Sequence, residues 1–313
     1  MFINKLIESI KEKKSSVVVG LDPRLELIPS IVKDKYFKKH GKTFKAAAES
    51  ILEFNKEIID NVCDIAVAVK PQIAFYEQYG IEGLKAYDET CRHASKKGLL
   101  IIGDIKRGDI GSTSKAYSKA HLGKTEVGGE YLQAFYSDSI TVNPYLGDDC
   151  LKEFVEDIEE YEKGMFVLVK TSNPSSSQLQ DLEVEGKKIY EKVAEMVNNW
   201  SDQYIGKFNY SSIGAVVGAT YPEEAKRLRE LMPSSYFLVP GYGAQGGTAD
   251  DVVPCFNKDG LGAVVNSSRG ILYAYKKEEK WTEESYGKAA RDAAITMRDD
   301  INTTLEKHDK KYW

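Results

Sequence analysis

Acidic and basic side chains alternate where an apolar run ends, in the segment IIGDIKRGDIGST (residues 101–113). Asp104 and Lys106 are two residues apart, so in a strand both side chains point to the same face. Asp109 follows in a glycine-containing loop, past the end of the run. Such a group is commonly a solvated ion pair, but the residues before it are typical of a buried strand. The segment therefore indicates charged side chains at the edge of a core.

A second lysine, Lys70, ends another apolar run, AVAV (residues 66–69). Burying a single ammonium group is costly, so Lys70 requires a carboxylate partner. Asp104 and Asp109 are the candidates, which predicts an alternating array of these aspartates with Lys70 and Lys106. Fixed charges of this kind can stabilise an anion that develops during a reaction.

Two glycine-containing segments near the end of the chain suggest a phosphate site. They are VPGYGAQGG (residues 239–247) and NSSRGI (residues 266–271). Glycines let backbone N–H groups approach an anion, and the Arg269 guanidinium can bind two phosphate oxygens at once. Neither segment matches a P-loop or a dinucleotide-binding fingerprint.

The elements that must position these residues are eight short apolar runs rich in Val and Ile. They cover residues 16–22, 65–72, 98–106, 139–145, 165–173, 212–220, 236–243 and 262–270. Their near-continuous apolar content is typical of parallel strands buried on both faces. Amphipathic stretches at 46–63, 80–98 and 221–232 predict intervening helices. Eight strand–helix units favour an α/β fold, a closed (β/α)8 TIM barrel, over an open doubly wound sheet.

In such a barrel the chemistry sits at the carboxyl ends of the strands, and the loops after the last two strands commonly bind phosphate. We expect residues 1–313 to form a single barrel domain with insertions near 23–45 and 174–211. The second insertion includes a helical segment over residues 183–200. The apolar spacing at the N-terminus, MFINKLIESI, is that of a helix and not of a signal peptide.

Composition narrows the class of protein. The formal net charge of −5 does not favour nucleic-acid binding, and no apolar stretch is long enough for a membrane span. Four cysteines without a C-x-x-C pair predict reduced thiols in a cytoplasmic protein rather than a zinc site or a disulfide framework. The four histidines have no metal-ligand spacing, so we expect neither a metal nor another cofactor.

Seven segments, in order from residue 20 to residue 271, resemble those of the orotidine 5′-phosphate decarboxylase family in its longer bacterial form. They are GLDPR, AVKPQIAFYEQYG, GDIKRGDIGST, TVNPYLG, VKTSNPS, VPGYGAQGG and NSSRGI. The pattern D-x-K-x-x-D-x-x-x-T is the most specific of these signals. The resemblance implies a TIM barrel that converts orotidine 5′-monophosphate to UMP, the last step of de novo pyrimidine nucleotide synthesis, without a cofactor.

The resemblance also implies a role for each matching residue. The catalytic residues would be Lys70, Asp104, Lys106 and Asp109, with Lys106 as the proton donor. Asp109 would act in the neighbouring subunit's active site, which implies a homodimer. The substrate-binding residues would be Asp22 and Thr113 at the ribose, Ser172 at the pyrimidine, Gln245 at the phosphate, the pyrimidine or both, Arg269 at the phosphate, and Pro240 in the loop that closes over the ligand.

Two alternatives remain open from the sequence. One is a sugar-phosphate decarboxylase or aldolase-like relative on the same barrel, which shares D-x-K-x-x-D and resembles magnesium-dependent enzymes. Lys70 at the end of its apolar run disfavours that alternative. The other is a non-catalytic binder of nucleoside monophosphates, which the complete set of four charged residues disfavours.

Overall fold

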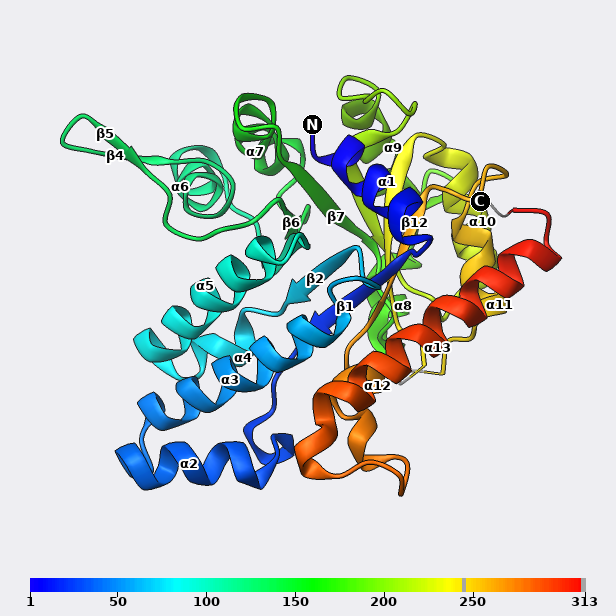
Figure 1. The fold of residues 1–313 in the computed structure, drawn as a ribbon. Coiled ribbons are helices and arrows are strands. Elements are labelled where there is room, and N and C mark those ends of the chain that lie inside the picture. Colours follow the sequence, from blue (N-terminus) through cyan, green and yellow to red (C-terminus); the bar gives the residue numbers. More distant parts are fainter. Residues whose placement is uncertain (244–245, 311–313) are drawn as a thin grey trace.

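Eight parallel strands form a closed barrel in this computed structural model, which describes residues 1–243 and 246–310 (Figure 1). Around the barrel the order is β1-β12-β11-β10-β7-β6-β3-β2, and β1 closes the ring by pairing with both β12 and β2. The strands are β1 (Val17–Leu21), β2 (Ala68–Pro71), β3 (Leu100–Arg107), β6 (Ser139–Val142), β7 (Gly164–Lys170), β10 (Ser211–Val217), β11 (Ser235–Pro240) and β12 (Ala263–Ser267). Each overlaps one of the eight apolar runs, so the predicted (β/α)8 barrel is confirmed.

Helices follow the strands and cover the outside of the barrel. They are α3 (Phe44–Val62), α4 (Ala74–Glu77), α5 (Gly80–Lys96), α6 (Gly111–His121), α7 (Asp148–Glu160), α9 (Ile189–Ser201), α10 (Pro222–Leu231), α11 (Ala249–Val252), α12 (Arg269–Leu272) and α13 (Tyr286–Lys307). The three helices expected from amphipathic spacing are α3, α5 and α10. Pro222 opens α10 and two glutamates follow it, which suits the first turn of a helix.

The N-terminal helix, α1 (Phe2–Lys13), closes the end of the barrel where the strands begin. Its ring residue Phe2 packs edge-on against Phe166 of β7, and the backbone N–H of Ile3 donates to the hydroxyl of Ser212 in β10. The apolar residues of α1 join the inward side chains of the strands in one inner core. Because this core fills the barrel where the strands begin, a ligand cavity is expected at the carboxyl ends of the strands.

Two connections depart from a plain barrel. Residues 23–45 form the short helix η1 (Leu25–Leu27), the helix α2 (Ser30–His40) and the start of α3. After β7, residues 174–188 form η2 (Pro174–Ser176), α8 (Ser177–Gln180) and a hairpin of β8 (Glu183–Val184) with β9 (Lys187–Lys188). The single-domain organisation stays a prediction.

The helix expected over residues 183–200 is wrong at its beginning. The first six residues form the β8–β9 hairpin, and its turn uses left-handed backbone at Glu185 (φ 56°) and Gly186 (φ 75°). The turn at Glu185 and Gly186 therefore favours a hairpin over the predicted helix, and the helix begins only at Ile189. From there α9 packs against β7 and β10 as one of the barrel's outer helices, so the extra segment is limited to residues 174–188.

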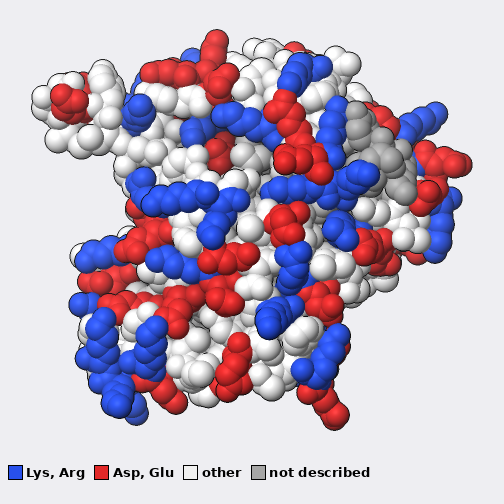
Figure 2. Space-filling model, viewed as in Figure 1, with Lys and Arg blue, Asp and Glu red and all other residues white. Residues whose placement is uncertain are grey.

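A second hairpin, of β4 (Thr125–Val127) and β5 (Glu130–Leu132), was not expected from the sequence. It projects from the body of the molecule beside α6 (Figure 1) and is largely uncharged in Figure 2. On the rest of the face in Figure 2, acidic and basic side chains are interspersed. None of the helices in the described part of the chain combines the length and apolarity needed to cross a bilayer.

One histidine is buried in the outer core. His121, in the last turn of α6, stacks on the ring of Phe135 with 5.0 Å between the ring centroids. Burial, assisted by the positive charge of Arg107, lowers the pKa of His121 to about 4. The folded protein therefore holds this imidazole neutral at pH values where an exposed histidine gains a proton.

This burial predicts acid sensitivity. Above pH 6.5 His121 is neutral in both the folded and the unfolded chain, so it has no effect there. Between pH 6.5 and about 4 only the unfolded chain binds the proton, so the free energy of unfolding falls by about 3 kcal/mol. Urea denaturation at about pH 7 and about pH 4.5 measures the loss. His121→Phe should reduce it, whereas His308→Gln, which changes an exposed histidine, should not; an unchanged loss in His121→Phe would contradict the assignment.

Candidate active site

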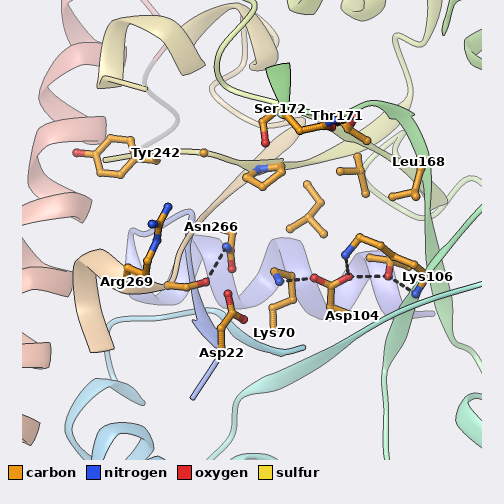
Figure 3. A pocket seen from close by; sticks show the side chains of 17 residues that line it. Asp22, Lys70, Asp104, Lys106, Leu168, Thr171, Ser172, Tyr242, Asn266 and Arg269 are labelled. Carbon is orange, nitrogen blue, oxygen red and sulfur yellow. Dashed lines mark hydrogen bonds and ion pairs between the residues drawn. The ribbon is translucent and has the colours of Figure 1, made fainter. Parts of the chain in front are cut away.

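A cavity of about 370 Å³ opens at the carboxyl ends of the strands (Figure 3). Its floor is apolar and consists of Leu168, Val216 and Leu238, which lie on top of the inner core. Polar side chains form its walls: Asp22, Lys70, Asp104, Lys106, Thr141, Thr171, Ser172, Asn173, Tyr242, Asn266, Ser268 and Arg269. All eight barrel strands, or the loops directly after them, contribute to the cavity. Seven supply wall residues, including Pro240 of β11, and β10 supplies Val216 of the floor.

Three of the four predicted charged residues meet in this cavity. The ammonium nitrogen of Lys70 lies 2.6 Å from Oδ2 of Asp104, and that of Lys106 lies 2.5 Å from Oδ1. Asp104 therefore stands between two lysines, one on each carboxylate oxygen (Figure 3). The Lys70 side chain is only 6% exposed, whereas that of Lys106 is 43% exposed. Lys70 is thus enclosed, and Lys106 is the lysine that a ligand can reach.

Two neutral side chains complete the shell around Asp104. Gln72 Nε2 donates to Oδ2 at 3.0 Å, and the Thr141 hydroxyl donates to Oδ1 at 2.9 Å. The same hydroxyl accepts the backbone N–H of Lys106 at 3.0 Å. Lys106 has left-handed backbone (φ 47°), which a residue with a side chain rarely adopts without support. Thr141 thus binds both the carboxylate of Asp104 and the backbone of Lys106.

Thr141 lines the cavity but was not among the residues predicted from the sequence, whereas Asn143, two residues further on, does not line it. β6 ends at Val142, so Thr141 is its last inward side chain. The Asn143 side chain lies past the strand, where its Oδ1 accepts the backbone N–H of Tyr145. Side chains of a strand alternate between its two faces, so counting back from the last residue of β6 would have identified Thr141. That count requires the exact end of the strand, which the sequence did not give.

The array keeps its members ionised. Burial opposes the carboxylate form of Asp104, but Lys70 and Lys106 outweigh it and hold the pKa of Asp104 well below its usual range. Burial likewise opposes the ammonium form of Lys70, but Asp104 and Asp22 outweigh it and raise the pKa of Lys70. At neutral pH Asp104 is therefore a carboxylate and its enclosed partner Lys70 an ammonium group.

The other end of the cavity contains Arg269, which follows β12 (Figure 3). Its loop lies directly against β1: a Cβ added at Gly20 would fall 1.9 Å from Oγ of Ser268. Pro240 lines the cavity at the end of β11, and Tyr242 follows with its ring on the wall and its hydroxyl donating to Asp300 of α13 at 2.6 Å. Gln245, expected here, lies outside the described residues.

Buried acceptor atoms at the middle of the cavity indicate a ligand rich in hydroxyl groups. Among the described residues, Oδ1 of Asp22 and Oδ1 of Asn266 are buried without a hydrogen-bond partner. Buried polar atoms in folded proteins are almost always paired. Both side chains line the cavity between Arg269 and the lysine array. Donors from a bound molecule, such as ribose hydroxyls, would satisfy them.

Two predicted residues do not reach this cavity within one chain. Asp109 lies past the end of β3, and its carboxylate accepts the backbone N–H of Ile110 at 2.8 Å. Thr113 is exposed on the first turn of α6. Neither lines the cavity, whereas Ser172 does. In the described part of the chain, no cluster of three or more His, Cys, Asp or Glu side chains could hold a metal ion.

The fold and this site define a class: a TIM-barrel enzyme with a lysine–aspartate–lysine centre at one end of its pocket and an arginine at the other. The comparisons with known proteins agree. The model of the orotidine 5′-phosphate decarboxylase / HUMPS family matches residues 15–283, and the chain belongs to that family. The resemblance stated from the sequence is thereby confirmed.

Similar proteins cover nearly the whole chain. The orotidine 5′-phosphate decarboxylase of Caldicellulosiruptor bescii is 45% identical over 304 residues, which is 97% of this chain and 99% of that protein. That of Rhodopirellula baltica is 46% identical over 303 residues, 96% and 98% of the two chains. A crystal structure of a putative orotidine-monophosphate decarboxylase from Toxoplasma gondii matches with a TM-score of 0.80 and 30% identity, over 99% of this chain and 98% of that one. The chain is thus an enzyme, a carboxy-lyase of this family.

The enclosed pair of Lys70 and Asp104 predicts a marked effect on stability. Lys70→Met leaves a buried carboxylate with only the partly exposed Lys106, so the free energy of unfolding should fall by about 3 kcal/mol. Adding Asp104→Leu removes the unpaired charge and should recover at least about half of that loss. Urea denaturation of the two variants at one protein concentration provides the comparison. A double variant that is less stable than Lys70→Met would contradict the account.

Proposed function

We propose that this enzyme decarboxylates orotidine 5′-monophosphate to UMP, the last step of de novo pyrimidine nucleotide synthesis. One observation carries the proposal: a single cavity contains Lys70, Asp104 and Lys106 at one end and Arg269 at the other. In this orientation Arg269 binds the phosphate and Asp22 the ribose. Ser172 and the apolar floor face the pyrimidine, and its C6 carboxylate lies at the lysine array.

Lys106 is the residue we assign to proton transfer. The bond between C6 and the carboxylate carbon breaks, CO2 leaves, and the electron pair remains at C6. The Lys106 ammonium group stabilises that charge and then donates a proton to C6, which gives UMP. The neutral amine regains its proton from solvent. The partial exposure of Lys106 into the cavity supports this role, since Lys70 is enclosed against Asp104.

Asp104 makes two contributions to the proposed reaction. Its carboxylate aligns both ammonium groups, and it also lies beside the carboxylate that the substrate loses. Two like charges about 4 Å apart repel by about 4 kcal/mol at an effective dielectric constant near 20. Because Asp104 stays ionised at neutral pH, that repulsion is present when the substrate is bound and vanishes with CO2. We rank stabilisation by Lys106 first and this repulsion second.

The phosphate end contributes although it lies away from the reacting carbon. Binding energy from a part of the substrate that does not react can organise the catalytic groups and drive closure of a loop. Pro240 and Tyr242, which end and follow β11, are the residues of that loop that line the cavity. We therefore assign the segment after β11 to closure over the phosphate.

We further propose a homodimer in the cytoplasm. Asp109 and Thr113 lie outside their own chain's cavity at the start of α6, which supports their action in the partner's site. All four cysteines are unpaired, as is usual in a reducing compartment.

The direct test is a spectrophotometric assay with orotidine 5′-monophosphate, with and without EDTA. We expect turnover that EDTA leaves unchanged, because side chains supply the positive charge at C6. Lys106→Ala should lower kcat at least about 10³-fold, since it removes both the charge and the proton donor. Its affinity for UMP should stay within about tenfold of wild type.

Two results would redirect the assignment. Activity on a sugar phosphate that EDTA abolishes would favour the aldolase-like relative. Tight UMP binding by the wild-type protein without any release of CO2 would favour a nucleotide sensor.

Shared active sites predict complementation between two inactive variants. Lys106→Ala and Asp109→Ala should each be inactive alone. After mixing and exchange of subunits, half of the dimers contain one intact site, so about a quarter of the wild-type activity should return. Mixing Lys106→Ala with Asp104→Ala, two residues of the same site, should restore much less. Equal recovery in both mixtures, or none in either, would contradict the assignment of Asp109.

A further inference from the structure

A fully buried lysine lies behind the cavity wall, and the proposed reaction does not use it. Lys170 is the last residue of β7, and its side chain is 0% exposed. The next residues, Thr171, Ser172 and Asn173, line the cavity. Lys170 is therefore directly attached to the wall that we assign to the nucleobase.

The ammonium group of Lys170 joins four elements. Its nitrogen lies 2.5 Å from Oδ1 of Asp181, the residue that ends α8. It also lies 4.7 Å from the ring centroid of Tyr221, before α10, and 5.3 Å from that of Tyr190, in the first turn of α9. Aromatic faces attract a cation, more strongly when both are desolvated. One charge thus binds the end of β7 to the extra segment and to two barrel helices.

Gln180, next to Asp181 in the extra segment, binds Thr171, which follows Lys170 and lines the cavity. The backbone N–H of Thr171 donates to Oε1 of Gln180 at 3.0 Å, and Nε2 of Gln180 donates to the Thr171 hydroxyl at 2.8 Å. Gln180 therefore binds Thr171, and Asp181 binds Lys170. These two residues tie the extra segment to the end of β7 by an ion pair and two hydrogen bonds.

β10 supports the wall from the other side. The backbone N–H of Gly218 donates to the carbonyl oxygen of Lys170 at 2.8 Å. A Cβ added at Gly218 would lie 2.9 Å from the Cα, Cβ and backbone nitrogen of Ser172, so the two backbones are in direct contact. Ser172 thus lies against Gly218, which follows β10, and next to Thr171, which Gln180 of the extra segment binds.

We propose that Lys170 and Asp181 are a positioning pair for the nucleobase, through which residues 174–188 set the enzyme's affinity for the base and not for the phosphate. The proposal rests on the proposed function. Figure 3 shows Thr171 and Ser172 on a wall away from Arg269, so a shift of this wall alters contacts to the base and leaves the arginine in place. A buried ion pair suits this purpose, because its geometry is fixed even where its net contribution to stability is small.

Calorimetric titration with two probes, UMP and ribose 5-phosphate, tests the pair. Asp181→Asn keeps the shape of the side chain and removes its charge. Lys170→Met with Asp181→Leu removes both charges and restores packing. In both variants we expect Kd for UMP to rise about tenfold or more, since small displacements of a positioning group have large effects. Kd for ribose 5-phosphate should stay within about twofold, and kcat/KM for orotidine 5′-monophosphate should fall in step with UMP affinity.

A matched control separates positioning from general loss of stability. Arg229 is another buried cation, whose guanidinium donates to the carbonyl oxygens of Cys255, Ser235 and Gly262, and it does not line the cavity. Arg229→Lys should lower stability while leaving both Kd values unchanged.

The outcomes are distinguishable. Unchanged UMP affinity in the charge-free double variant overturns the inference. So does a parallel loss of ribose 5-phosphate affinity, which would indicate general damage to the pocket. Failure of the wild-type protein to bind UMP would instead overturn the proposed function.

Discussion

The active site is organised around one carboxylate, that of Asp104, held between the side chains of two lysines. Each oxygen of Asp104 faces a different lysine, and Thr141 and Gln72 occupy positions that would otherwise be left to water. The carboxylate is thereby fixed in rotation as well as in charge. Lys70 is enclosed, and its ammonium group contributes to the lowered pKa of Asp104. Lys106 faces the cavity, where its ammonium group is available to a ligand.

The barrel provides what this centre requires. The inner core and α1 fill the end of the barrel where the strands begin, so the charged residues lie beside an apolar floor. Electrostatic interactions are stronger in such surroundings than in water, and immobile groups need no reorganisation during the reaction. The same closed ring brings Arg269, which is distant in sequence, to the other end of the cavity. The extra segment after β7 is attached to a further wall of the cavity through the ion pair of Lys170 with Asp181, which is the basis of the proposed positioning role.

Local pattern predicted much of this arrangement. Continuous apolar runs identified all eight strands, and two-residue parity placed Asp104 and Lys106 on one face. Features that the sequence pattern did not predict depend on how one segment is positioned relative to another. Thr141 reaches Asp104 only through the register of β3 and β6, which shifts between Gly103 and Arg107 where Lys106 turns left-handed. The β8–β9 hairpin depended on turn geometry within a helix-like pattern. The role expected of Asp109 in a neighbouring subunit involves a second copy of the chain, whose position neither the sequence pattern nor a single chain provides.

In the proposed reaction, fixed side-chain charges stabilise a negative charge at C6 of the pyrimidine. Microscopic reversibility gives it a direct measurement: exchange of the C6 proton of UMP with solvent deuterium, followed by NMR in D2O. We expect the wild-type enzyme to catalyse this exchange and Lys106→Ala, although it still binds UMP, not to catalyse it. Undiminished exchange by Lys106→Ala, or none by a wild-type enzyme that decarboxylates its substrate, would contradict this expectation.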